Sequence, residues 1–378
     1  MKGLYVARLD LNQAHLAGVA RKIEAQMGAL AKAGAPTELL CLRDGAIVLA
    51  DKTLASAGDG WSRRRNHHFA FHDQIVAAAA SADFVFIRYQ GAPPAFLSAL
   101  ARLKKRRPEL PVVLEIPSWP FATERRGLRA QLLGAFEDVG NPRLRRYVDQ
   151  VVTFSQAEEI FGIPTLRTDN GVDVETIPLA ASPPPPDGLL RVTGVANLSF
   201  WHGYDRVIEG LANYGAAGGR RPVRFEIVGS GAEEPQLRQQ VERSGLAGIV
   251  DFLGPLHGAE LDRHMAGCHV GISSIGMHRL DVDTSNIKSR EFCARGLPFV
   301  IGYPDRDFPR TLPFVLHIPA DESPLDIEAL IRWYDTLRTE KPDPAPQMRA
   351  YAEANLTWHA KFKPVVDWLH TRIGETAS

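Results

Sequence analysis

The residues best suited to chemistry lie in one stretch, Asp281–Pro298, which reads DVDTSNIKSREFCARGLP. Ser285 and Asn286 are good N-caps and predict that a helix begins here, with Lys288 in its first turn. The helix dipole disfavours a lysine in that turn unless an anion binds beside it. Glu291 follows, and its carboxylate could accept a hydrogen bond from a sugar hydroxyl. The pattern fits a phosphate clamp beside a ribose acceptor. The alternative is a solvated helix start with an i,i+3 Lys–Glu pair.

Glycines follow two of the expected strands, at points where backbone could approach a ligand closely. Gly18 opens a helix after the first strand, and the free N–H groups of that helix could face an anion. Gly229 and Gly231 follow the strand at 223–229, at the end where parallel sheets bind ligands. Ordinary turns use glycine in the same way. The absence of a G-x-G-x-x-G motif argues against a dinucleotide-dependent dehydrogenase.

The elements that must position these residues alternate along the whole chain. Short apolar runs predict buried strands, and the segments between them have helical periodicity, as in 18–33. This alternation predicts parallel sheets covered on both faces. The expected strands are 3–9, 37–42, 83–89, 111–116, 150–155, 191–198, 223–229, 249–254, 269–274 and 298–302, with helices at 204–214, 233–244, 258–266 and 286–295.

The alternation of strands and helices is interrupted at 180–190, where four consecutive prolines cannot continue a helix or a central strand. We place the domain boundary there. The prediction is an N-terminal domain at 1–182, a C-terminal domain at 190–345, and C-terminal helices at 346–378 that pack back on the N-terminal domain. Such doubly wound domains bind ligands at the carboxyl ends of their strands.

Composition narrows the function classes. The 378 residues carry 44 basic and 44 acidic side chains, so net charge gives no reason to expect nucleic-acid binding. Residues 1–180 are nevertheless basic overall and residues 181–378 acidic. Three cysteines without metal-site spacing suit a reducing cytoplasm. The start of the chain reads as a strand, and no apolar stretch is long enough to span a bilayer, so we expect a cytoplasmic protein.

The order of these motifs resembles that of retaining glycosyltransferases of family 4. In that family two acidic residues lie eight positions apart, as Asp283 and Glu291 do here, followed by a small residue, Gly and Pro before a strand. The family's Arg and Lys diphosphate contacts are replaced by Asn197 and His202. Lys288, Arg206 and a protonated His202 would then supply the lost charge. The segments WHGYDR (201–206) and KSRE (288–291) resemble the corresponding segments of a bacterial envelope-polysaccharide subgroup.

The N-terminal half agrees with this resemblance. Gly18 matches the family's glycine loop, and Asp169–Asp173 matches its "NGVD" turn. Arg88 and Tyr89 stand where the family commonly has an active-site histidine, and the segment from Glu115 resembles an acceptor-side loop. The resemblance implies catalytic roles for Lys288, Glu291 and Arg88; a donor site of Gly18, His202, Arg206, Gly229, Gly231, Asp283, Ser285, Asn286, Lys288 and Glu291; and an acceptor site of Arg88, Tyr89, Glu115, Trp119 and Glu124.

Rival signals point elsewhere. Asp281 and Asp283 form a D-x-D, which binds metal in the other major glycosyltransferase fold, but they follow a second-domain strand, and we interpret the match as coincidental. His67, His68 and His72 have zinc-like spacing, but no carboxylate or cysteine set completes the site except Asp73, and a solvated polar face explains them. Gly271-Ile-Ser273 lacks the next glycine of a nucleophile elbow, which argues against a hydrolase. We expect no cofactor and no metal.

The resemblance implies an α/β chain of the GT-B fold, with two doubly wound Rossmann-like domains facing a central cleft. It implies transfer of a sugar from a nucleotide-diphosphate sugar to a glycan or lipid-linked acceptor. A nucleotide-sugar epimerase of the same fold and a non-catalytic nucleotide-sugar-binding protein remain alternatives. Basic clusters in the N-terminal half predict peripheral contact with the inner face of the membrane, or else serve solubility: 63–65, 104–107, 125–126 and 143–146.

Overall fold

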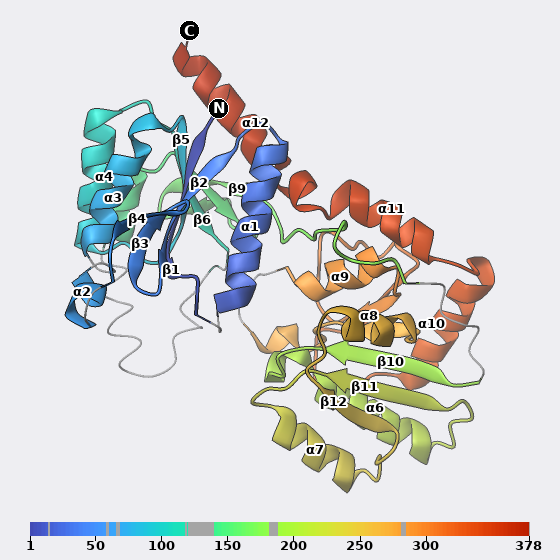
Figure 1. Cartoon of the computed structure of the whole chain (residues 1–378). Helices are drawn as coiled ribbons and strands as arrows, with labels where there is room; N and C mark the ends of the chain where they lie inside the picture. The colour runs from blue at the N-terminus through green and yellow to red at the C-terminus, as the bar shows by residue number, and fades with distance from the viewer. Residues whose placement is uncertain are drawn as a thin grey trace. The chain divides into compact units, whose positions relative to one another are not determined.

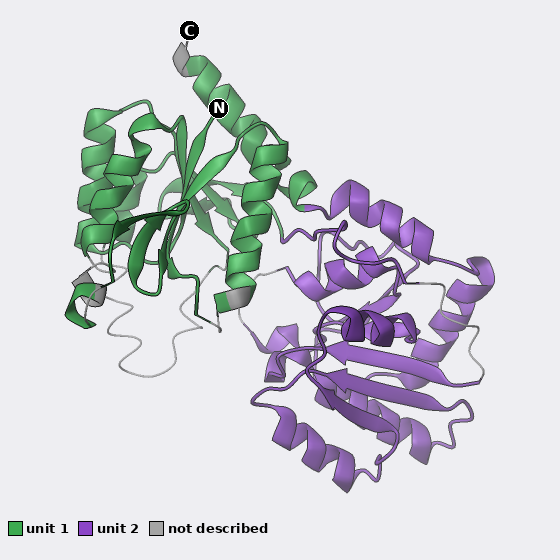
Figure 2. Ribbon diagram, viewed as in Figure 1, with its two compact units in different colours: residues 1–169, 282–284, 358–378 green, residues 170–281, 285–357 purple. Residues whose placement is uncertain are grey.

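The computed structural model describes residues 1–13, 16–57, 60–65, 69–117, 119, 140–180, 188–280 and 285–377. The chain forms two compact units (Figure 2). Unit 1 contains residues 1–169 and 358–378, and unit 2 contains residues 170–281 and 285–357. Asp281, Asp283, Glu124, His67, His68 and the proline run, all of which entered the sequence argument, lie outside the described residues.

Unit 1 is built on a mainly parallel sheet (Figure 1). Its described strands run in the order β4-β3-β2-β1-β5-β6-β7-β9-β8, and the antiparallel pairs among them are β2–β3, β3–β4 and β8–β9. The strands are β1 (Gly3–Asp10), β2 (Thr37–Arg43), β3 (Ala46–Leu49), β4 (Lys52–Ala55), β5 (Phe84–Arg88), β6 (Val112–Ile116), β7 (Gln150–Thr153), β8 (Glu159–Ile160) and β9 (Ile163–Arg167).

Alternation along the buried strands divides their side chains between two cores. Leu4 and Val6 face one side of the sheet, where α3 (Phe71–Ala78) and α4 (Pro94–Arg106) cover them. Tyr5 and Ala7 face the other side, where α1 (Ala17–Lys32) packs beside α12 (Trp358–Ala377). A short helix, α2 (Gly60–Arg65), precedes α3. This is the pattern expected of strands buried on both faces.

Unit 2 repeats the architecture with a sheet that is parallel throughout its described strands. The order is β12-β11-β10-β13-β14-β15. The strands are β10 (Leu190–Val195), β11 (Val223–Val228), β12 (Val250–Gly254), β13 (Val270–Ile272), β14 (Phe299–Ile301) and β15 (Val315–His317). One core contains side chains of α6 (Tyr204–Ala216), α7 (Glu234–Arg243) and α10 (Ile327–Glu340), and the other contains those of α8 (Gly258–Ala266), α9 (Ile287–Arg295) and α11 (Ala345–Asn355).

The expectation of two doubly wound α/β domains is therefore confirmed. The division along the chain differs in detail from the prediction. Residues 170–180 group with unit 2, where the Val172 N–H donates to Leu356 and the Ala180 N–H to Arg295. Of the C-terminal helices, α11 packs on α9 within unit 2, and α12 packs on α1 within unit 1. None of the helices in the described part of the chain is both long and apolar enough to cross a bilayer.

Candidate functional site

The helix start predicted near Ser285 is present, and Asn286 is its N-cap. The Asn286 Oδ1 accepts a hydrogen bond from the Lys288 backbone N–H at 3.3 Å, and its Nδ2 donates to Ser274 Oγ at 2.5 Å. Ser285 is buried, and its Oγ accepts from the Asn170 N–H at 2.8 Å. Asn286 thus joins the start of α9 to the loop that follows β13, at the carboxyl end of that strand.

Lys288 is the most unusual residue at this helix start. Its amino nitrogen is inaccessible to solvent and has no hydrogen-bond partner in the described part of the chain. Burial lowers the pKa of this amino group from 10.5 to about 7, against the opposing influence of the Glu291 carboxylate. A buried ammonium without a partner is costly, so the residue is placed to gain from an anion.

His202 does not supply the missing positive charge. It is buried at the end of a short 3-10 helix (Phe200–His202), and its Nδ1 accepts a hydrogen bond from the Ser199 N–H at 3.1 Å. Burial, and then the positive charge of Lys288, lower the pKa of His202 to about 3. The expectation of a protonated His202 is therefore corrected: the imidazole is neutral at physiological pH.

The Arg206 side chain is likewise occupied, by hydrogen bonds to backbone carbonyls. Its side chain is 1% exposed, and its guanidinium donates to the carbonyls of Ser323 at 2.6 Å and Pro319 at 3.1 Å, and to that of Ile275. The carbonyl of Ile275 belongs to the loop between β13 and α9. This arrangement leaves the predicted diphosphate contact of Arg206 without support, because its donors already hold loops together.

The glycines of the second unit serve close packing of the chain on itself. Gly229 has φ +113°, and a Cβ there would lie 1.9 Å from the Ala196 carbonyl oxygen. A Cβ at Gly231 would lie 2.3 Å from the Leu198 carbonyl oxygen. Both glycines let the β11–α7 turn approach the loop after β10. Gly18 differs, because it is exposed in the first turn of α1 with open space around it.

A buried ion-pair network, which the sequence analysis did not predict, joins α9 to the residues that follow β14. The fully buried Arg290 guanidinium binds both oxygens of Asp305, at 2.6 and 2.8 Å, and one of Asp307 at 2.6 Å. It also donates to the carbonyl of Asn286 at 3.0 Å. The motif that follows Glu291 does not contain the partners of Arg290, because Asp305 and Asp307 lie beyond β14. Nothing local in the sequence marks Arg290 as buried, because its 0% exposure results from the fold.

In unit 1, two residues predicted to meet the acceptor instead meet each other. Arg88 ends β5 and Glu115 lies opposite it on β6, with 2.7 Å between Nη1 and Oε2. Glu115 has no exposed surface and also accepts from Gln26 at 2.8 Å and from the Tyr5 hydroxyl at 3.4 Å. Burial alone would raise the pKa of Glu115, but the Arg88 and Lys22 charges hold it below its ordinary value. Glu115 is thus a buried counter-ion, and Arg88 is positioned by it.

Aromatic side chains gather beside this pair. The ring of Phe161 lies 5.7 Å from that of Tyr89 and 5.2 Å from that of Trp119, in tilted and edge-on arrangements. The Tyr89 hydroxyl donates to Asn141 Oδ1 at 2.5 Å. Of the five predicted acceptor residues, the structure therefore pairs Arg88 with Glu115 and places Tyr89 and Trp119 each against Phe161. Glu124 and Asp283 lie outside the described residues.

Comparison with solved structures finds chains similar over their whole length. HepE of Anabaena, solved in complex with UDP, is 17% identical with a TM-score of 0.58, covering 100% of this chain and 99% of that one. A glycosyltransferase from Rickettsia africae is 12% identical with a TM-score of 0.64 over 98% of each chain. Sucrose-phosphate synthase from Thermosynechococcus elongatus is 15% identical with a TM-score of 0.61 over 100% of both.

The fold is GT-B. At these identities the similarity shows the fold alone. A scan of protein-family models and a search of curated proteins find no match to the sequence. What the GT-B chain does must therefore be argued from its site.

Proposed function

We propose that this chain is a retaining glycosyltransferase that takes a sugar from a nucleotide-diphosphate donor, with the diphosphate bound at the start of α9. One observation carries the proposal: the Lys288 amino group is buried without a partner among the described residues, at the N-terminus of a helix beyond the carboxyl end of β13. Ligands of doubly wound sheets bind at that end of the strands.

The energetics of Lys288 favour an anionic ligand. The positive end of the α9 dipole and the low polarity around the amino group both oppose a charged lysine. A diphosphate reverses both effects, because it pairs with the ammonium and accepts hydrogen bonds from the free N–H groups of the helix. In a transfer reaction the same groups would stabilise the negative charge that develops on the leaving diphosphate. No protein nucleophile is required for attack on the same face of the donor sugar.

The other roles follow from the positions of the residues. Glu291, half-buried one turn along α9, would accept a hydrogen bond from the donor ribose. Ser285 and Asn286 would position that helix start, since both bind neighbouring loops rather than solvent. His202 would contribute as a neutral side chain. We propose an envelope glycan or lipid-linked acceptor, with Arg88, Tyr89 and Trp119 on its side and Glu115 as the buried counter-ion of Arg88.

The uridine nucleotides are the first donors to test, because HepE was solved with UDP and with UDP-glucose. Thermal shift and calorimetry with UDP, GDP and ADP select the base, since a bound nucleotide stabilises the folded state by mass action. The matched pair of variants is Lys288→Met and Lys341→Met, because Lys341 is an exposed lysine of the same unit. Nucleotide binding that is lost in the first variant and kept in the second supports the site.

The products then separate the candidate functions. With donor and an acceptor glycan, a transferase gives a new glycoside with retained anomeric configuration. An epimerase changes the donor sugar without a second substrate. A binding protein gives neither product nor hydrolysis. Nucleotide affinity that is equal in wild type and Lys288→Met would remove α9 from the proposal.

A further inference from the structure

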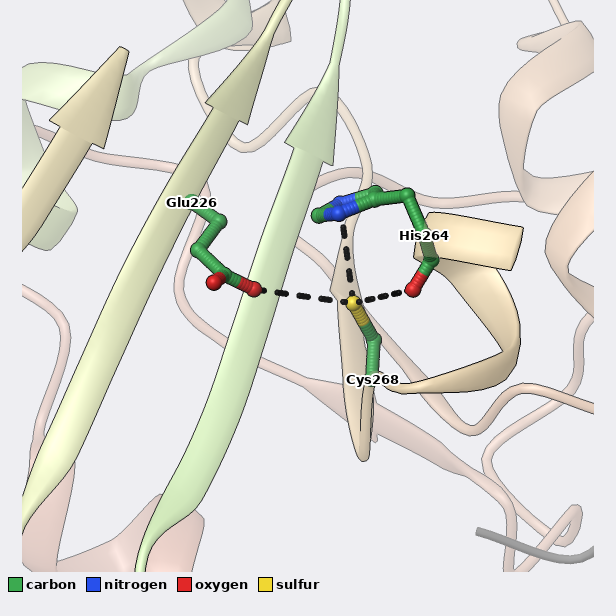
Figure 3. Close-up of side chains that lie close together, drawn as sticks. All are labelled: Glu226, His264 and Cys268. Carbon is green, nitrogen blue, oxygen red and sulfur yellow. Dashed lines mark hydrogen bonds between the residues drawn. The ribbon is translucent and has the colours of Figure 1, made fainter. Parts of the chain in front are cut away.

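Three metal-ligating side chains converge in unit 2, away from the proposed donor site (Figure 3). Glu226 projects from β11, and His264 and Cys268 come from the end of α8 and the residues after it. The Cys268 Sγ lies 3.6 Å from His264 Nε2 and 3.9 Å from Glu226 Oε2, and one ligand atom from each residue lies within 4.8 Å of the others.

These separations suit a tetrahedral cation. Zinc binds thiolate sulfur at about 2.3 Å and imidazole nitrogen at about 2.0–2.1 Å, so two such ligands on a tetrahedron lie roughly 3.5 Å apart. The observed sulfur–nitrogen distance of 3.6 Å already matches that edge. The carboxylate oxygen lies 3.9 Å from the sulfur and within 4.8 Å of the nitrogen, so it must move closer to both, which a glutamate on a strand achieves by rotating its side-chain torsions.

The surrounding groups also suit a divalent cation. A carboxylate and a thiolate together balance its two positive charges. Without a cation, the described residues give Glu226 an ion pair with the Arg191 guanidinium, at 3.5 Å. Cys268 is 1% exposed, so the site is dry on the sulfur side. Thr193 Oγ1 donates to the Glu226 carbonyl and lies 2.8 Å from His264 Nε2, so the His264 ring must turn away from Thr193 before Nε2 can bind the ion.

We propose that Glu226, His264 and Cys268 bind a zinc ion that fastens the end of α8 to β11. On binding, the thiol proton leaves to solvent, the imidazole proton moves to Nδ1, and three metal–ligand bonds form, with water at the fourth position. His264 and Cys268 precede β13, whereas Asn286 and Lys288 follow it. Glu226 is in register with Thr193, and Thr193 with Gly271 in the middle of β13, so the ion would lie against the middle of the sheet and add stability by fastening α8 to β11.

The test uses the purified full-length chain, stripped with a chelator and titrated with Co²⁺ as a spectroscopic substitute for zinc. We expect one equivalent to produce the near-ultraviolet charge-transfer absorption of a cobalt–thiolate bond. Cys268→Ala should abolish it, and Cys41→Ala, which removes a buried cysteine of unit 1, should leave it unchanged. Zinc should displace the cobalt and raise the melting temperature of wild type but not of Cys268→Ala.

A second variant, His264→Gln, tests the site independently of Cys268. His264→Gln changes a less buried residue, so it tests the site if Cys268→Ala fails to fold. It should weaken zinc affinity by more than the roughly 10–100-fold that loss of an outer-shell partner costs. Cobalt that binds without a thiolate band, for example at other histidines, would overturn the proposal. So would a band that persists in folded Cys268→Ala.

Discussion

Replacing Lys288 by methionine should make the unliganded protein more stable while it destroys the nucleotide site. Methionine keeps the length and apolar stem of lysine but removes the buried ammonium. Burial lowers the pKa of Lys288 from 10.5 to about 7, which means that the fold opposes the charged form. At pH 8 the folded lysine is mostly neutral, and the unfolded lysine is still protonated.

The size of the effect follows from this difference. Each pKa unit corresponds to about 1.4 kcal/mol, so releasing the proton at pH 8 costs at most about 3.5 kcal/mol of folding free energy. Because the structure relaxes around a charge and Lys288 is only partly buried as a residue, we expect about 1–3 kcal/mol of added stability in Lys288→Met. Lys341→Met, at an exposed position, should change stability by less than about 0.5 kcal/mol.

The stability difference between Lys288→Met and wild type depends on pH in a defined direction. Below pH 7 both folded and unfolded chains are protonated at Lys288, and the full penalty is present. Between pH 7 and 10.5 the unfolded chain binds the extra proton, so wild-type stability from this group rises with pH. The advantage of Lys288→Met should therefore be largest below pH 7 and vanish near pH 10.5. The comparison with wild type cancels other groups that titrate in the same window.

The assay is urea unfolding at several pH values, combined with calorimetry of nucleoside-diphosphate binding. Binding at pH 8 should be accompanied by uptake of close to one proton in wild type, because the diphosphate raises the pKa of Lys288. This uptake should be absent in Lys288→Met. A Lys288→Met protein that is less stable than wild type across this pH range, and that binds nucleotide as tightly as wild type, would refute this prediction.

Two further substitutions and two assays of the unaltered protein have expected outcomes. Glu291→Ala should weaken nucleotide binding by about 1.5–3 kcal/mol in calorimetry, the range for hydrogen bonds to charged groups, and an unchanged affinity would remove Glu291 from the site. Arg206→Ala should lower the free energy of unfolding by about 2–4 kcal/mol, because buried carbonyls lose their donor, and a loss of turnover without any loss of stability would restore Arg206 to the diphosphate. Transferase turnover, measured well below the melting temperature, should need no added divalent metal; abolition by EDTA with rescue by manganese would contradict this. Sedimentation with acidic vesicles at low salt should exceed that with neutral vesicles, at roughly 1 kcal/mol per basic residue near the surface, and equal, negligible binding to both would leave the basic clusters as ordinary surface.

Local periodicity was sufficient to predict the architecture. Alternating apolar strands and amphipathic helices specify a parallel sheet covered on both faces, and both units have it. Asn286 as the cap of α9, with Lys288 in the first turn, was also predictable, because capping depends on residues close in the sequence. The helix α9 begins one residue later than expected, which is within ordinary fraying.

Side-chain partners distant in the sequence were not predictable in this way. The sequence presents Arg206, Arg88 and Glu115 as free charges, whereas the fold pairs Arg88 with Glu115 and surrounds Arg206 with carbonyls of two loops. Glu226, which lies 42 residues before Cys268, reaches it only because parallel β-strands bring distant segments together.

Protonation was decided by the tertiary structure as well. The same histidine and lysine would be ordinary titrating groups in an unfolded chain. Burial makes His202 a neutral side chain and leaves Lys288 an amino group without a partner in the described part of the chain. Sequence spacing thus determined where α9 begins. Only the folded chain decided which charges are already neutralised there, because desolvation depends on every segment that packs around a group.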